Sequence, residues 1–224
     1  MPLFVEKPIA LSAAHAAPTL ERLAGAMAIT AVGYMNRYRP SVQAARDALS
    51  GTTVLGLSAH WVGGRYAVPW WSDDAHSGGP INEQTTHLVD LARYLVDDVV
   101  EVQAIGASEA AAVTLRFANG VLGSLLYTCQ AKQKAIGMHV IGEDTRVTLD
   151  GWDFRLRGED GRLFPEGDAD RNQIFELEVA AFFDAIHKGS TDPILSDFAD
   201  AMRTQNTVDA IRRALGSGRT EAVD

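Results

Sequence analysis

The sequence predicts an α+β (α/β) fold, in which a mostly antiparallel sheet with helices on one face follows a short strand–helix–strand unit. Three observations support this fold class. Residues 1–38 have the pattern strand, helix, strand, which is typical of a parallel crossover. Residues 99–150 contain closely spaced strand-like runs, which indicate an antiparallel meander. Two amphipathic helices then close the chain, over residues 172–188 and 197–215.

The strand–helix–strand unit begins with a short apolar strand at Leu3–Val5. Ser12 is a favourable N-cap for a helix over residues 13–24, and Gly25 is suited to end that helix. A second buried strand is expected over residues 27–32. Two parallel strands are too few to form a domain by themselves, because both faces of a parallel sheet need to be covered.

The middle of the chain supplies one more helix and the strands of the meander. A helix is expected over residues 40–49, where proline suits the first turn, and a strand over residues 53–62. Asn119-Gly120 marks a tight hairpin between two later strands, and residues 164–170 are expected to form a loop. The apolar residues of the closing helices that we expect to face the core are Phe175, Val179, Phe182, Phe183 and Ile186 in the first, and Phe198, Met202, Val208, Ile211 and Leu215 in the second.

Composition indicates a globular protein and argues against several classes of partner. The 224 residues are 46% hydrophobic and 22% charged, which is enough for a sizeable core. The net charge of -9 argues against nucleic acid or an anionic membrane surface as a partner. Cys129 is the single cysteine, so no intrachain disulfide forms, and the six histidines follow no metal-binding pattern. Because Glu6, Lys7 and Pro8 interrupt the apolar start, no signal peptide is expected, and a cytoplasmic location is the default.

Residues 77–95 contain the first candidate functional site. A Gly-Gly-Pro entry at residues 78–80 precedes a helical pattern in which Glu83 and His87 are spaced i, i+4 and share one face. Asp90 lies one further turn along the same side, and either carboxylate would favour the protonated form of His87. A carboxylate–imidazole pair beside a glycine-lined opening is a candidate acid/base site. The same pair is equally compatible with an ordinary solvated helix face.

Several motifs follow one another along the chain. They are Val5-Glu6-Lys7-Pro8, Gly33-Tyr34-Met35-Asn36-Arg37-Tyr38, Trp70-Trp71, and Gly78-Gly79-Pro80 with Glu83 and His87. In this order they resemble the Gfo/Idh/MocA oxidoreductases, whose naming members are glucose–fructose oxidoreductase and inositol dehydrogenase. Proteins of this family have an N-terminal Rossmann domain that binds NAD or NADP. Their C-terminal domain has a large, mostly antiparallel sheet, which supplies substrate contacts and commonly the oligomer interface. The resemblance implies that residues 1–38 are the last crossover of a Rossmann domain and that residues 39–224 are the substrate-binding and oligomerisation domain.

The resemblance also implies roles for individual residues. Lys7 would bridge the substrate hydroxyl and the nicotinamide, His87 would accept the hydroxyl proton, and Glu83 stands where many members have a substrate-binding aspartate. These roles agree with the chemistry, because an ammonium stabilises a developing alkoxide and an imidazole suits the proton transfer. The expected catalytic residues are Lys7, His87 and Glu83; the expected cofactor contacts are Glu6, Lys7, Pro8 and Arg37; and the expected substrate contacts are Asn36, Arg37, Trp71, Glu83 and His87.

The dinucleotide-binding fingerprint G-x-G-x-x-G does not occur after a strand anywhere in the sequence. Three interpretations follow. The chain is the substrate side of an NAD(P)-dependent oxidoreductase acting on a sugar, polyol or similar secondary alcohol; or it is a stand-alone binding or scaffold protein; or it is a cofactor-independent isomerase or lyase that uses Glu83 and His87. We expect a small polar substrate, no metal, and a homo-oligomer formed through the C-terminal sheet.

Overall fold

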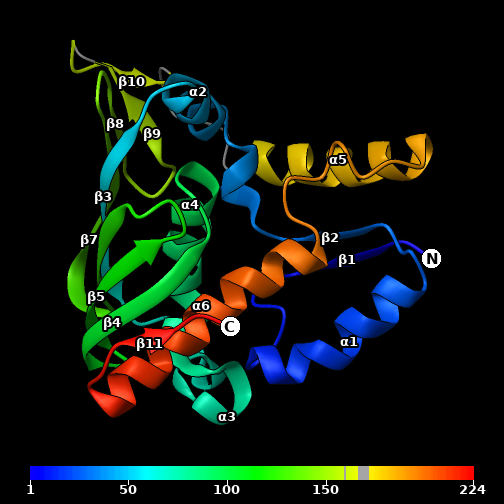
Figure 1. Ribbon diagram of the computed structural model, residues 1–224, viewed down its shortest axis with the longest axis horizontal. Helices are drawn as coiled ribbons and strands as arrows, with labels where there is room; N and C mark the ends of the chain where they lie inside the picture. Colours follow the sequence, from blue (N-terminus) through cyan, green and yellow to red (C-terminus); the bar gives the residue numbers. More distant parts are fainter. Residues whose placement is uncertain (159, 166–171) are drawn as a thin grey trace.

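The computed structural model describes residues 1–158, 160–165 and 172–224, and a nine-stranded sheet dominates these ranges (Figure 1). The strand order is β10-β9-β8-β7-β3-β6-β5-β4-β11, and every neighbouring pair is antiparallel except β3 and β6. This arrangement confirms the predicted fold class. The strands are β3 (Val54–Gly64), β4 (Val99–Ala107), β5 (Ala110–Phe117), β6 (Leu122–Thr128), β7 (Gln130–Gly142), β8 (Arg146–Asp150), β9 (Arg155–Arg157), β10 (Leu163–Phe164) and β11 (Glu221–Ala222).

The position of β3 corrects the expected meander. The strands β4, β5 and β6 do follow one another, with the hairpin at Asn119-Gly120. However, β3 lies between β6 and β7, parallel to the first and antiparallel to the second. Both edges of β3 are therefore paired, and its inward side chains Leu57, Ala59 and Trp61 lie in the core. Sequence spacing predicted the strands but not this insertion, because β3 pairs with segments more than 50 residues away.

Helices cover one face of the large sheet, as predicted (Figure 1). The helix α2 (Pro40–Leu49) packs on β8 and β9, α4 (Thr86–Leu95) on β3, and α6 (Phe198–Ser217) on β4. The alternation of strand side chains puts every second residue into this core. The largest fully buried side chains of this layer are Leu88, Leu91, Leu115, Phe117, Leu125, Tyr127, Met138, Leu149, Phe154 and Ile211.

The opposite face of the sheet carries no helix in Figure 1. Its centre is formed by small and apolar side chains of β3, β4, β5 and β6, including Ser58, Ala112 and Ser124. Ile105 and Leu126 on this face are 76% and 51% exposed. The centre of this face thus has few charged groups.

The N-terminal residues form the expected parallel crossover, separate from the large sheet. The strand β1 (Leu3–Val5) pairs in parallel with β2 (Thr30–Val32), and α1 (Ala13–Gly25) connects them. Ser12 caps α1 as predicted, because its side chain accepts a hydrogen bond from the backbone N–H of His15. The strand β2 is shorter than expected, since Met27 has a φ of 46° and its side chain is exposed. A residue in the left-handed region cannot continue a strand.

The helix α5 (Gln173–Lys188) contradicts the expected core stripe. Phe183 is 54% exposed, and Phe175 and Val179 are also exposed. Figure 1 shows α5 beside β1 and β2, well away from the large sheet, with α1 on the other side of this strand pair. The helix contacts η1, a 3₁₀ turn at Met35–Tyr38, so only a narrow stripe is covered. The expected stripe of α6 is confirmed at Phe198, Met202, Val208 and Ile211, which are buried.

Two further observations complete the fold. The expected loop at 164–170 lies mostly outside the described residues, and Phe164 belongs to β10. Within the described ranges, no helix is both long enough and apolar enough to cross a membrane.

Candidate active site

Lys7 and Glu83, which are 76 positions apart in the sequence, lie in direct contact. The Lys7 Nζ donates a hydrogen bond to the backbone carbonyl of Glu83 at 2.9 Å, and it lies 3.8 Å from Glu83 Oε2. Burial lowers the pKa of the Lys7 ammonium below its ordinary value, although Glu83 and Glu6 act in the opposite direction. Burial raises the pKa of Glu83, and Lys7 opposes this rise. The structure therefore brings together two of the three predicted catalytic residues.

The segment that carries Glu83 is not a regular α-helix. After the short helix α3 (Asp74–Ser77), Gly78 and Gly79 both have a φ of 78°, and a side chain at Gly79 would overlap the Asp74 carboxylate. One π-helical turn, η3 (Ile81–Thr85), then leads into α4. A π turn is closed by i to i+5 hydrogen bonds, so the backbone between Glu83 and α4 is wider than the regular α-helix that the sequence predicted. The left-handed conformation at positions 78 and 79 is the reason that both residues are glycine.

His87 is buried against the sheet, with 7% of its surface exposed. Its ring stacks on Trp61 of β3, with the ring centroids 5.5 Å apart and an interplanar angle of 14°. Among the described residues, no side chain or backbone group forms a hydrogen bond with its ring nitrogens. Burial, followed by the charges of Lys7 and Arg39, lowers the pKa of His87 well below its ordinary value. His87 is therefore a neutral imidazole with ring nitrogens available to a ligand.

This result corrects one electrostatic expectation. We expected Glu83 or Asp90 to favour the protonated form of His87. Instead, burial and the positive charges of Lys7 and Arg39 lower the pKa of His87, and neither carboxylate contributes to it. Glu83 is paired with Lys7, and Asp90 is paired with Arg37. The sequence could not show that both carboxylates were already bound to other partners.

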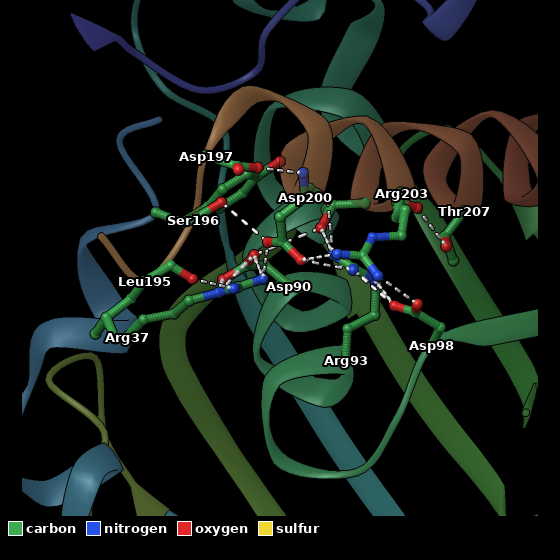
Figure 2. Close-up of polar contacts among 12 residues, drawn as sticks. Arg37, Asp90, Arg93, Asp98, Leu195, Ser196, Asp197, Asp200, Arg203 and Thr207 are labelled. Carbon is green, nitrogen blue, oxygen red and sulfur yellow. Dashed lines mark hydrogen bonds and ion pairs between the residues drawn. The ribbon is translucent and has the colours of Figure 1, made fainter. Parts of the chain in front are cut away.

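Arg37 lies in a buried ion-pair network (Figure 2). Its Nη2 is 2.7 Å from an oxygen of Asp90 and 2.7 Å from an oxygen of Asp200, and its Nη1 donates to the carbonyl of Leu195 at 2.5 Å. Burial opposes the charged form, but Asp90 and Asp200 raise the pKa of Arg37 overall. All three guanidinium nitrogens are thus engaged in joining η1 to α4 and α6. The expected cofactor or substrate contact of Arg37 stays a prediction, and the observed geometry favours a structural role.

The same network continues through Asp200 to the start of β4 (Figure 2). Arg93 of α4 lies 2.9 Å from Asp200 and 2.7 Å from Asp98, and Arg203 of α6 lies 2.8 Å from Asp98. These contacts hold the two helices and the first strand of the meander in one fixed arrangement. His87 is on α4, so the network also fixes the helix that positions it.

The remaining predicted site residues have well-defined surroundings. The Asn36 Oδ1 accepts a hydrogen bond from Arg39 Nε at 2.7 Å. Trp71 is buried and packs edge-on against Tyr66, with the ring centroids 5.3 Å apart. Glu6 is exposed and Pro8 is half-buried on either side of Lys7, and the Lys7–Pro8 peptide bond is cis. The ligand contacts expected of Asn36, Trp71, Glu6 and Pro8 stay predictions.

Sequence reasoning gave no role to Trp61, Arg39, Trp152 or Lys134. The Trp61 ring stacks on His87, and the charge of Arg39 acts on His87. Arg39, which directly precedes α2, is buried and lies over the ring of Trp152 at 5.7 Å. The Lys134 Nζ lies 5.9 Å from the same Trp152 ring and 5.9 Å from the ring of Tyr66. Two sequence signals could have found these residues. Arg39 directly precedes Pro40, which favours an extended backbone, and Trp61 is at an inward position of β3.

The described residues do not form a complete dinucleotide site, and the expected contact of Lys7 with the nicotinamide stays a prediction. The parallel pair β1 and β2 has no glycine-rich strand–turn–helix beside it in the described ranges, so no residues there fit the pyrophosphate and adenosine. No cluster of three or more His, Cys, Asp or Glu side chains in the described part of the chain is placed to hold a metal ion.

Comparison with known proteins supports the resemblance. Residues 42–148, a little under half of the chain, match the profile of the GFO/IDH/MocA C-terminal domain. The resemblance seen in the sequence is therefore confirmed, and the matched residues run from α2 to β8 of the large sheet.

Matches to curated relatives extend over nearly the whole length of the chain. Inositol 2-dehydrogenase of Rhizobium meliloti (strain 1021) is 25% identical over 222 residues, which are 96% of this chain and 63% of the relative. An uncharacterised protein of Schizosaccharomyces pombe (strain 972 / ATCC 24843) is 26% identical over 259 residues, which cover 95% of this chain and 62% of the relative. The chain thus spans less than two thirds of the length of these curated relatives.

Solved structures confirm the fold. Levoglucosan dehydrogenase in complex with NADH superimposes with a TM-score of 0.86 at 20% identity, over 99% of this chain and 73% of that chain. A putative myo-inositol dehydrogenase from Sinorhizobium meliloti 1021 gives a TM-score of 0.81 at 23% identity, with the same coverage. At these identities the match concerns the fold and not the activity.

Proposed function

We propose that this chain is the substrate-side and catalytic part of an NAD(P)-dependent oxidoreductase that acts on a sugar, polyol or similar secondary alcohol. The observation that carries the proposal is His87, a buried neutral imidazole without a hydrogen-bonding partner among the described residues, beside the Lys7 ammonium. The names of the relatives, inositol 2-dehydrogenase and levoglucosan dehydrogenase, support this class of substrate.

Each of the three residues has one task in this proposal. A ring nitrogen of His87 accepts the proton of the substrate hydroxyl, which requires the imidazole to be neutral. Lys7 donates a hydrogen bond to the same oxygen and stabilises the alkoxide that develops as the proton leaves. Glu83 holds the Lys7 ammonium in position through its backbone carbonyl and its carboxylate. Hydride acceptance is the chemistry that a bound NAD or NADP would supply.

The positive charge of Lys7 serves the reaction twice. It lowers the pKa of His87, so that the imidazole stays unprotonated, and it faces the negative charge that forms on the oxygen. Because Glu83 is partly buried with Lys7, solvent screens this pair less than it would screen an exposed pair. The charges of Lys7 and Glu83 are therefore less sensitive to ionic strength than those of an exposed pair.

We further propose that a segment outside these 224 residues binds the pyrophosphate and adenosine and docks along β1. The strand β1 pairs with β2 on one edge, and among the described residues no strand pairs with its other edge. An unpaired strand edge is a template for a further strand. The greater length of the curated relatives supports this arrangement.

Ligand titrations test the proposed function. Calorimetric titration of the folded chain with myo-inositol and D-glucitol should show saturable binding, and His87→Gln should weaken it about three- to tenfold, because one hydrogen bond to the hydroxyl is lost. His76→Gln is the matched control, since His76 is an exposed histidine paired with Asp73. Equal binding by the native chain and His87→Gln would contradict the assigned role of His87.

A second titration addresses the cofactor. Nicotinamide fluorescence should show weak or no binding of NADH and NADPH to this chain alone, because the described residues do not form a complete dinucleotide site. Tight saturable binding of either nucleotide would show that the chain builds a complete cofactor site, and the proposed outside segment would then be wrong.

A further inference from the structure

Arg39 is a buried cation whose end groups have no acceptor. The residue is 4% exposed, and only its Nε forms a hydrogen bond, to Asn36 Oδ1. The Nη2 is fully buried and has no partner among the described residues, and no hydrogen bond of Nη1 occurs there either. Buried guanidinium groups in proteins are ordinarily paired with anions, because an isolated buried charge is costly. This exception requires an explanation.

The residues around Arg39 fix the plane of its guanidinium group but do not pair with its positive charge. The guanidinium lies over the ring of Trp152, and Asn36 holds its Nε. Asp153 is the acid whose charge acts on Arg39, and its carboxylate also lies 4.0 Å from Arg155. Burial lowers the pKa of Arg39 to about 10, so the side chain is still charged at neutral pH. A planar, pre-oriented fork with free N–H groups is thus present next to the site.

Arg39 borders the same group of aromatic side chains as the proposed reaction centre. Its guanidinium lies over the Trp152 ring at 5.7 Å. The ring of Phe154, two residues after Trp152, lies 6.2 Å from the ring of Trp61, which stacks on His87. The charge of Arg39 also acts on His87.

The charge balance around His87 is opposite to that of the whole chain. The chain has a net charge of -9. Around His87, the charge of Lys7 is offset by Glu83, whereas Arg39 has no ion pair among the described residues. A local positive field in an acidic protein attracts an anionic ligand.

We propose that Arg39 binds the carboxylate of an acidic sugar or polyol, such as an aldonate or a uronate, while His87 and Lys7 engage a hydroxyl of the same molecule. This inference rests on the proposed function and names its substrate class. The guanidinium fork matches a carboxylate in a bidentate geometry, which makes a strong, orientation-specific contact. Lys134 adds a second positive charge near the same aromatic ring.

Matched pairs of neutral and acidic ligands test this inference by calorimetry. The pairs are D-glucitol with D-gluconate and galactitol with D-galactonate, and D-glucose 6-phosphate separates phosphate from carboxylate recognition. The acids should bind at least about tenfold more tightly than their alcohols, because hydrogen bonds to charged groups are the stronger ones. Arg39→Gln should abolish this preference, and Arg39→Lys should retain part of it. Arg22→Gln, which removes an exposed arginine of α1, is the control and should have no effect.

The outcomes separate this inference from the proposed function. If alcohols bind as well as acids, or if Arg39→Gln keeps the preference for acids, the inference is wrong while the proposed function stands. If glucose 6-phosphate binds more tightly than gluconate, Arg39 recognises a phosphate and not a carboxylate, and the inference is wrong. If the folded chain binds no member of the panel, the proposed function fails, and the inference fails with it. If Arg39→Gln does not fold, the native chain still tests the inference. Increasing salt concentration should weaken the binding of the acids and leave the binding of the alcohols unchanged.

Discussion

Glu178 on α5 is a buried carboxyl group with an unsatisfied oxygen. The residue is 2% exposed, and its Oε1 has no partner among the described residues. Burial, with smaller contributions from Glu6 and Asp90, raises the pKa of Glu178 to about 8. The side chain is therefore mostly protonated in the folded protein at neutral pH, whereas it is ionised in the unfolded chain.

This difference predicts a pH-dependent stability. The contribution of Glu178 to stability is fully present below its unfolded pKa and is lost as pH rises through the folded pKa of about 8. Glu178→Gln cannot ionise, so it should match the native chain near pH 4.5 and be more stable above pH 8, by on the order of 1–4 kcal/mol. Urea denaturation at several pH values measures this. Exposed Glu176→Gln, on the same helix, should change little at any pH, and parallel curves for Glu178→Gln and the native chain would contradict the prediction.

Sequence patterns could predict residues of the candidate site only where the residue type itself carries the chemistry. Lys7, Glu83 and His87 were found in this way, and the structure brings Lys7 and Glu83 into contact. The state of each side chain depended on residues far away in the sequence. Asp90 is bound to Arg37 and not to His87, and Arg39 is left without an acid by the placement of distant strands and loops. No local pattern contains such information.

At the scale of elements, the buried pair of Arg37 and Asp90 connects η1 to α4. Removing one partner of such a pair leaves an uncompensated buried charge, which costs about 3–5 kcal/mol. Asp90→Asn should therefore lower the free energy of unfolding by about this amount in urea denaturation. The control is Asp184→Asn, which breaks the exposed i, i+4 pair with Lys188 and should cost under about 0.5 kcal/mol. Similar losses in the two variants would show that the network is not the connection we describe.

The elements themselves were predictable to different degrees. Caps and prolines gave the bounds of α1 and α2 almost to the residue, because these signals are local. The burial of α5 was predicted wrongly, since its apolar stripe does not say which partner covers it. The π turn η3 was also missed, because a run of helix-forming residues does not distinguish i+4 from i+5 hydrogen bonding.

At the scale of the whole molecule, the uncovered face of the large sheet is our candidate for a contact between two copies of the chain. Exposed Leu126 lies on β6 beside the small residues of this face. We expect a dimer at micromolar concentration in sedimentation velocity, and Leu126→Glu should convert it to a monomer by burying an unpaired charge. Leu177→Glu, at a comparably exposed leucine of α5, should remain dimeric. Dissociation by Leu177→Glu alone would place the contact on α5 instead.

The insertion of β3 between β6 and β7 has a consequence for how the protein is made. Between the synthesis of Val54 and that of Gly142 the ribosome adds roughly 90 residues, which at about 5–20 residues per second takes on the order of 4–18 s. Until Leu122–Thr128 have been added, the strand at the centre of the finished sheet has neither of its two neighbours, and until Gly142 has been added it lacks one of them. Residues 54–64 are therefore a segment of the nascent chain on which a chaperone would act until β7 has emerged.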